Sequence, residues 1–257
     1  MTMKRTAMIM PILLGVLLTT VSVSATELTE QPRQARQSQA LVAKAWAFDP
    51  DPNLPNVLIM GDSNTIGFVI KLRELLRGKA NVAFPLRENG APDNCANSGY
   101  GLENIDRFVG STKWAVIHFN WGLHDAIRFK TVNGKRVGDR SGEWQNSEWQ
   151  NSPEVYAANL EKIVARLKQT DAKLIWGTSS VVNQGVLHVL PGDERILNEI
   201  ATKIMTNHRI PINDIYALTK DFKPEEFRAP GDIHFSPLGF DRIAEQVAER
   251  IQKALEK

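Results

Sequence analysis

Short apolar runs alternate with longer segments of helical periodicity from residue 56 to the end of the chain. The short runs predict buried strands, and they span residues 56–60, 81–84, 114–120, 173–177 and 212–215. The periodic segments predict helices, and they span residues 65–77, 101–109, 153–168, 193–207 and 237–255. Because parallel strands need crossover connections and helices on both faces, this alternation predicts an α/β fold of three layers, a helix-sheet-helix sandwich.

One long connection breaks this pattern, at residues 123–151. A loop of this length in a compact domain is usually functional or disordered. Trp144 and Trp149 lie in it between polar residues, and exposed indole rings stack well on sugars and other flat partners. The insertion is therefore either a binding lid or a mobile segment whose tryptophans pack back on the domain.

The N-terminus carries the pattern of an export signal. Lys4 and Arg5 precede an apolar run that ends in small residues at 23–25, which predicts a signal peptide over residues 1–25 with cleavage after Ala25. An uncleaved membrane anchor is the alternative, because the run is about as long as a short spanning helix. Residues 26–45 are predicted to form a mobile polar leader, and residues 46–257 a single domain without internal repeats.

Charge and composition exclude several functions. The chain has 31 Lys and Arg against 29 Asp and Glu, and removing Lys4 and Arg5 leaves a net charge of zero. A neutral domain lacks the electrostatic footprint of a nucleic-acid or anionic-membrane protein. Cys95 is the single cysteine, so no intramolecular disulfide is possible; it is either a free thiol near a site or a small buried residue. No zinc or phosphate-loop spacing is present, and nothing indicates an oligomeric state.

Polar clusters follow the predicted strands, where ligands bind in a parallel sheet. They are Gly61-Asp62-Ser63-Asn64, Asn94 to Gly101, Gly122-Leu123-His124-Asp125, and Gly231-Asp232-Ile233-His234 before the last helix. A serine becomes a nucleophile when a base takes its proton and an acceptor orients that base. Ser63, His234 and Asp232 supply one residue of each kind, and the glycine turns supply N–H donors for a negative oxygen.

These motifs resemble the GDSL/SGNH hydrolase superfamily, in the order "GDSN", "NCANSGYG", "GLHD" and "DIHFSPLGF". The resemblance implies a parallel, flavodoxin-like sheet and a serine esterase that needs no cofactor. It also implies that Ser63 is the nucleophile and His234 the base. In the oxyanion hole, the Ser63 N–H and the Gly99 N–H would be donors, with the Gly101 N–H as an alternative to the second.

The sequence departs from the family pattern at two positions. The third block usually has Asn where this chain has His124, so either the His124 ring or the Asn120 side chain would complete the oxyanion hole. The family acid lies three residues before the histidine, and that position is Gly231. Either Asp232 orients His234 from two residues away, or a backbone carbonyl does so and the enzyme works as a Ser-His dyad.

Several polar residues near these motifs also have structural interpretations. Asp62 and Asn64 flank the serine and are candidates for substrate binding, as are the two tryptophans of the insertion; Asp62 is also expected to fix the turn through backbone N–H groups. Asp125 is expected to bond its own loop, His118 to be a core residue, and His188 to lie on the surface or in a loop.

The predicted function is that of an exported, periplasmic or secreted, serine esterase. Its acyl-enzyme would form on Ser63, and the polar loops and tryptophans favour short acyl groups such as acetyl on carbohydrate. The partner is then a small-molecule or carbohydrate ester, with no nucleic acid and, after signal cleavage, no membrane. A thioesterase or lysophospholipase of the same fold remains an alternative, as does a non-catalytic carbohydrate-binding protein.

Overall fold

The computed structural model describes residues 41–141, 144 and 147–256. Residues 42–257 form one compact unit. The predicted signal peptide and most of the predicted leader lie outside the described residues. This unit begins four residues before the predicted domain boundary at 46, because residues 42–46 are helical and Trp46 is buried against Phe84, with ring centroids 5.6 Å apart.

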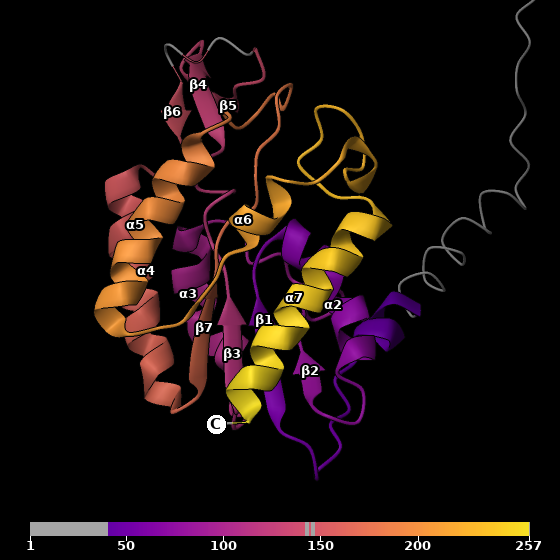
Figure 1. Cartoon of the computed structure of the whole chain (residues 1–257). Coiled ribbons are helices and arrows are strands. Elements are labelled where there is room, and N and C mark those ends of the chain that lie inside the picture. Colours follow the sequence, from indigo (N-terminus) through magenta and orange to yellow (C-terminus); the bar gives the residue numbers. More distant parts are fainter. Residues whose placement is uncertain (1–40, 142–143, 145–146, 257) are drawn as a thin grey trace, which may run out of the picture. The chain divides into compact units, whose positions relative to one another are not determined.

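Five parallel strands form the central sheet of this unit, in the spatial order β2-β1-β3-β7-β8 (Figure 1). The strands are β1 (Asn56–Met60), β2 (Asn81–Ala83), β3 (Val116–Phe119), β7 (Lys173–Gly177) and β8 (Ile212–Asn213). Numbered by their order in the chain, they run 2-1-3-4-5 across the sheet, which is the flavodoxin-like order. The predicted fold class is confirmed.

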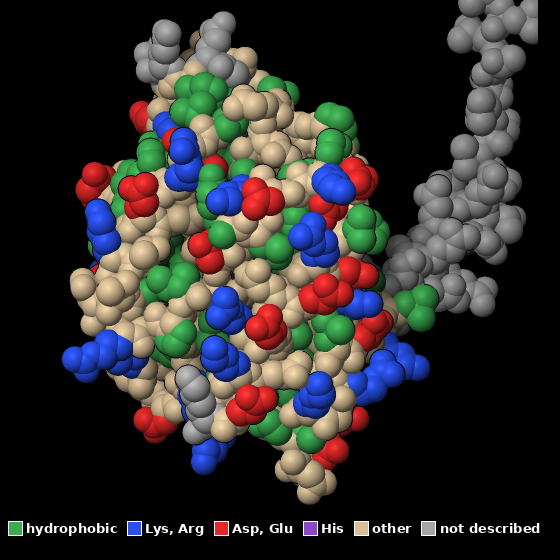
Figure 2. All heavy atoms as spheres, viewed as in Figure 1, with side chains coloured by type: hydrophobic (Ala, Val, Ile, Leu, Met, Phe, Trp, Pro, Cys, Tyr) green, Lys and Arg blue, Asp and Glu red, His purple; other side chains and the backbone are tan. Residues whose placement is uncertain are grey.

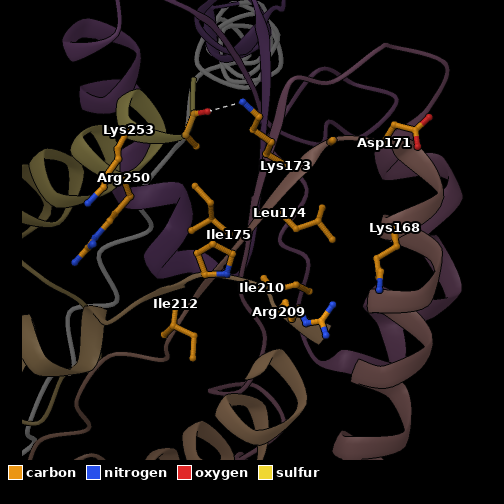
Figure 3. Close-up of a pocket in the computed structure, with 13 residues that line it drawn as sticks. Lys168, Asp171, Lys173, Leu174, Ile175, Arg209, Ile210, Ile212, Arg250 and Lys253 are labelled. Carbon is orange, nitrogen blue, oxygen red and sulfur yellow. Dashed lines mark hydrogen bonds between the residues drawn. The ribbon is translucent and has the colours of Figure 1, made fainter. Parts of the chain in front are cut away.

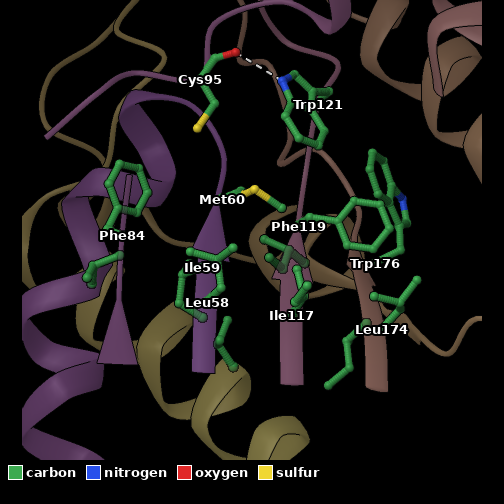
Figure 4. Packing of buried hydrophobic residues seen from close by; sticks show 14 of the residues in the cluster. Leu58, Ile59, Met60, Phe84, Cys95, Ile117, Phe119, Trp121, Leu174 and Trp176 are labelled. Carbon is green, nitrogen blue, oxygen red and sulfur yellow. Dashed lines mark hydrogen bonds between the residues drawn. The ribbon is translucent and has the colours of Figure 1, made fainter. Parts of the chain in front are cut away.

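The apolar runs form strands because both faces of the sheet are covered. The last four residues of β1 and all four of β3 are buried. Leu58 lies opposite Ile117 in the register, and Phe119 lies opposite Trp176. Figure 4 shows these side chains filling the space around the middle strands. A strand buried on both faces has no polar alternation, which is the pattern that the sequence shows.

The helices form the two outer layers. The first layer packs α2 (Ser63–Leu75) against α7 (Pro237–Leu255), and the second packs α4 (Pro153–Leu167) between α3 (Ser98–Val109) and α5 (Asp193–His208) (Figure 1). In the described part of the chain, none of the helices combines the length and the apolar character that crossing a membrane requires. On the face shown in Figure 2, Lys and Arg side chains are interspersed with Asp and Glu.

Side-chain caps explain three boundaries that differ from the sequence prediction. The helix predicted from Thr65 begins at Ser63, because Asp62 caps it. The helix predicted from Gly101 begins at Ser98, because the Asn97 side chain accepts hydrogen bonds from the first turn. The strand predicted to reach Ile215 ends at Asn213, because Asp214 caps the short helix α6 (Ile215–Thr219). The described residues also include two 3₁₀ turns, η2 (Lys168–Thr170) and η3 (Pro224–Glu226).

The insertion at residues 123–151 contains a small antiparallel sheet rather than a structureless loop. Its strands are β4 (Arg128–Val132), β5 (Lys135–Gly138) and β6 (Glu148–Trp149), in the order β5-β4-β6. Asn133 and Gly134, both at positive φ, make the two-residue hairpin turn. The sheet is tied to α5 by a buried ion pair, in which Arg128 Nε lies 2.8 Å from Asp193 Oδ2.

Candidate active site

Ser63 is the first residue of α2, directly after the turn that follows β1. The Asp62 side chain caps the helix by accepting hydrogen bonds from the N–H groups of Asn64 (2.9 Å) and Thr65 (3.4 Å). Asp62 therefore has the structural role expected for it. Among the described residues, the Ser63 N–H has no acceptor, so it is free to bind a ligand at the positive end of the helix.

The structure brings Ser63 and His234 together, although 171 residues separate them in the chain. Ser63 Oγ lies 2.8 Å from His234 Nε2. His234 Nδ1 lies 2.8 Å from Asp232 Oδ1, which also accepts a hydrogen bond of 2.9 Å from the His234 backbone N–H. The side chains of His234 and Asp232 are 25% and 20% exposed, so the group is open to a substrate.

The charge on Asp232 sets the tautomer of His234. Burial would raise the pKa of Asp232, but hydrogen bonds from Arg228 and from His234 outweigh it and hold the pKa below its ordinary range. The ionised carboxylate can only accept, so Nδ1 carries the proton and the lone pair on Nε2 faces the Ser63 hydroxyl. Arg228 Nε lies 2.5 Å from Asp232 Oδ2, while its Nη2 lies 3.0 Å from Nδ1. That second contact joins two donors and is not a hydrogen bond in this tautomer.

Gly231 explains why the acid lies two residues before His234 rather than three. Its φ is +72°, and a Cβ added there would lie 2.8 Å from the carbonyl oxygen of Gly185. An aspartate at position 231 would suffer both backbone strain and this contact. The close approach packs the loop of His234 against the loop that follows β7, and Asp232 provides the carboxylate instead.

We expect Gly231→Ala to lower the free energy of unfolding by about 1–3 kcal/mol, because a Cβ at positive φ is strained and also meets Gly185. Gly78→Ala is a matched control, since Gly78 has the same φ of +72° but no atom within 4 Å of the added Cβ. Urea unfolding of both variants measures the difference. Equal losses in the two variants would show that the contact with Gly185 contributes nothing.

Of the four predicted oxyanion donors, two are free in the described part of the chain and two are engaged in hydrogen bonds of the fold. Among the described residues, the Ser63 N–H and the His124 ring have no hydrogen-bond partner. The Gly99 N–H, in contrast, donates to Asn97 Oδ1 at 3.0 Å as part of the α3 cap. The Asn120 amide donates to the Gly177 carbonyl at 2.7 Å. Gly99 and Asn120 are therefore engaged in the fold, and the alternative Gly101 N–H bonds the Asn97 carbonyl oxygen.

Asp125 joins separate loops instead of bonding only its own, which corrects the expectation for it. It accepts hydrogen bonds from the Ser98 N–H (3.0 Å), the Ser98 hydroxyl (2.6 Å) and Asn151 Nδ2 (2.7 Å). Burial raises the pKa of this carboxyl, and these hydrogen bonds oppose the rise. The second and third motif loops are thereby fixed to each other and to the end of the insertion.

The structure gives the remaining candidates for substrate binding different surroundings. Asn64 is buried, and its Nδ2 donates to the Ile233 carbonyl at 3.1 Å, so it ties α2 to the His234 loop. Trp149 packs against Arg128, whose guanidinium lies 4.2 Å from the ring centroid, as the packed-back interpretation expects. Trp144 is half-buried, and its carbonyl oxygen accepts from the Ser147 N–H. Among the described residues, neither tryptophan forms a hydrogen bond or a ring contact with Ser63 or His234.

His188 lies in the loop that follows β7, which is one of the two placements expected for it, and it is half-buried. Burial lowers its pKa, and the charges of Arg140, His124 and His234 lower it further, while the charge of Asp232 opposes this. Its loop packs against the His234 loop where Gly185 meets Gly231.

Cys95 and His118 belong to the core. Cys95 is fully buried, and burial raises the pKa of its thiol, so the residue is inert. Burial lowers the pKa of His118 to about 4, which keeps it neutral. Among the residues that the structure describes, no group of three or more His, Cys, Asp or Glu is arranged to hold a metal ion.

Comparison with known proteins gives fold neighbours at low sequence identity. No protein-family model and no curated protein matches the chain. Among solved structures, the lipase/acylhydrolase from Enterococcus faecalis has a TM-score of 0.59 at 17% identity, covering 77% of this chain and 96% of that one. The acetyl xylan esterase AlAXEase has a TM-score of 0.56 at 14% identity, covering 76% and 99%.

A GDSL-like lipase from Bacteroides thetaiotaomicron is similar over a longer stretch. Its TM-score is 0.56 at 15% identity, covering 85% of this chain and 98% of that one. In each case 96–99% of the neighbour is matched, so the likeness covers nearly the whole of each neighbour's fold. The chain therefore has the fold of the GDSL/SGNH lipases and esterases.

Proposed function

We propose that the protein is a serine esterase that works through an acyl-enzyme on Ser63. The observation that carries this proposal is the chain of short contacts from Ser63 Oγ to His234 Nε2 and from His234 Nδ1 to Asp232, each 2.8 Å long. A nucleophile, a base and an orienting carboxylate in this order are the arrangement that acyl transfer requires. The fold of the neighbours, which are esterases and lipases by name, is consistent with it.

In the proposed reaction, His234 Nε2 takes the Ser63 proton as Oγ attacks the ester carbonyl. The imidazolium that forms is stabilised by ionised Asp232. The carbonyl oxygen becomes negative and is held by the Ser63 N–H and by the His124 ring, the two predicted donors without partners in the described structure. His234 then gives the proton to the leaving alcohol. Water, activated by the same imidazole, hydrolyses the acyl-enzyme and restores Ser63.

The polar surroundings of Ser63 support a short acyl group. Asp62 and Asn64 lie beside it, and His234 and Asp232 face it. We propose acetyl esters of carbohydrates as the substrate class, and one fold neighbour is an acetyl xylan esterase.

A series of p-nitrophenyl esters with acyl chains from C2 to C12 tests this proposal. We expect kcat/KM to be highest for the acetate and to fall by about tenfold or more at C8, because polar surroundings give a long acyl chain little apolar surface to bind. Release of acetate from acetylated xylo-oligosaccharides should follow. A kcat/KM that rises with chain length would favour the lysophospholipase or thioesterase alternative, and absence of hydrolysis for every ester would contradict the esterase proposal.

We also propose that the protein is exported, on the basis of residues 1–25. Expression of the full chain in a Gram-negative host, followed by osmotic release and mass spectrometry, tests the cleavage site. The expected product begins at Thr26. A product that stays in the membrane fraction with Met1 intact would support the uncleaved anchor.

A further inference from the structure

A cavity of about 590 Å³ lies at the opposite end of the sheet from Ser63. It is lined by the first residues of β7 and β8, Lys173 and Ile212, whereas Ser63 follows the last residue of β1. Because all strands of the sheet are parallel, their first and last residues mark opposite edges. Figure 3 shows the cavity between the end of α7, which carries Arg250 and Lys253, and the end of α4 beside Lys168.

The floor of this cavity is aliphatic. Leu174, Ile175 and Ile210 line it and are 3–8% exposed, and Ile212 and Pro211 extend it. The volume is in the range of small-molecule sites, which lies between about 300 and 1,000 Å³. An apolar hollow of this size can hold an alkyl chain or a similar apolar group.

The rim of the cavity carries five basic side chains and one acidic side chain. The acid is Asp171, and the bases are Lys168, Lys173, Arg209, Arg250 and Lys253. Lys173 Nζ donates to the Ala254 carbonyl at 2.9 Å, while the other four bases form no ion pair or side-chain hydrogen bond with any described residue. Some bases elsewhere, such as Arg166 and Arg228, pair with carboxylates. Others, such as Arg77 and Lys220, have no ion pair among the described residues, so the distinctive feature of the rim is that four such bases surround one hollow.

We propose that this cavity binds an anionic amphiphile, with its apolar chain on the aliphatic floor and its carboxylate or phosphate head among the four unpaired bases. Positive charge that gathers around a hollow, in a domain with balanced charges, is complementary to an anion. Arg209 and Arg250 can bind either type of head group through two parallel hydrogen bonds. The concave shape favours a single molecule over the flat surface of a membrane.

Isothermal titration calorimetry of the purified chain with decanoate and with decyl phosphate, both below the concentration of micelle formation, tests the proposal and distinguishes the two head groups. We expect binding of at least one of them. Acetate, inorganic phosphate and decyltrimethylammonium, which lack the chain or the negative charge, should bind at least about tenfold more weakly. Equal binding of decanoate and decyltrimethylammonium would overturn the proposal.

Two variants locate the site. The Arg209→Ala/Lys253→Ala variant should weaken binding about tenfold or more, while Arg77→Ala/Lys220→Ala, which removes the same charge from exposed positions away from the cavity, should not. Ala254→Trp should block the cavity and abolish binding. Equal affinity in the two double variants would overturn the proposal, as would binding to anionic vesicles without binding to the monomeric amphiphiles.

Hydrolysis of p-nitrophenyl acetate should be unchanged in all these variants, because the cavity and Ser63 lie at opposite edges of the sheet. The amphiphile proposal and the esterase proposal can therefore be contradicted separately. Loss of amphiphile binding with hydrolysis retained contradicts only the cavity proposal, and the reverse result contradicts only the esterase.

Discussion

Ser63→Ala is expected to lower kcat/KM for p-nitrophenyl acetate by about 10⁴-fold or more, because removal of the nucleophile leaves only binding and the oxyanion donors. The variant should fold normally. The helix cap is made by Asp62, not by Ser63, so the loss of one hydroxyl should change the free energy of unfolding by about 0.5 kcal/mol or less. Steady-state kinetics together with thermal unfolding separate a catalytic loss from a folding defect.

Ser111→Ala is the matched control for this prediction. Ser111 is exposed, and its side chain has no hydrogen-bond partner among the described residues. It should retain wild-type activity. A Ser63→Ala enzyme with more than about a tenth of wild-type activity would mean that another group attacks the ester, and an equal, low background in wild type and both variants would favour the non-catalytic binding protein.

Asp232→Asn is expected to lower kcat/KM by about 10²–10⁴-fold. An asparagine at this position must place its NH₂ group against either Arg228 or His234 Nδ1, since the native carboxylate accepts hydrogen bonds from both. Rotating the amide oxygen toward Arg228 presents a donor to Nδ1, and His234 then carries its proton on Nε2. That tautomer cannot accept the Ser63 proton, so the loss should appear in kcat rather than only in KM.

Asp221→Asn, which changes an exposed aspartate, is the control for this loss. The measurement is the pair of constants kcat and KM for p-nitrophenyl acetate at neutral pH. A fall of less than about threefold in Asp232→Asn would support the dyad alternative, in which a backbone carbonyl orients His234. A crystal structure of the variant in which His234 Nδ1 bonds a backbone carbonyl oxygen would support the dyad alternative directly.

Most of the central fold could be predicted, because a strand buried on both faces leaves a continuous apolar run that is short and closed by glycine or a polar residue. The start of α4 could also be predicted, because Ser152 is a helix cap and Pro153 occupies the first helical position. The small sheet in the insertion was missed, although Asn133-Gly134 is a strong hairpin signal. Its strands are too exposed to show an apolar pattern.

The candidate site was predictable in its residue types and less so in its geometry. Ser63, His234 and Asp232 follow from the motifs, and the structure brings them together. The engagement of Gly99 and Asn120 in hydrogen bonds of the fold could not be predicted, because it depends on the side chain of Asn97 and on the neighbouring strand. Motif order alone does not tell which donors remain free.

Long-range contacts account for the other differences. Asp125 bonds a loop 27 residues away, and the loop of Gly231 packs against Gly185. Such contacts depend on how the carboxyl ends of separate strands converge, which no local pattern encodes. Arg228 belongs to the same class, since it bonds Asp232 without any motif that marks it.

The central claim is that the Ser63 hydroxyl is an activated nucleophile, and covalent labelling tests it most directly. Wild-type enzyme would be incubated with diethyl p-nitrophenyl phosphate, digested, and analysed by mass spectrometry, with His234→Ala treated in parallel. We predict one diethylphosphoryl group per chain on Ser63, formed in step with loss of esterase activity, and little labelling of the variant. Esterase activity that persists while Ser63 stays unlabelled, or labelling at a different residue, would contradict the account.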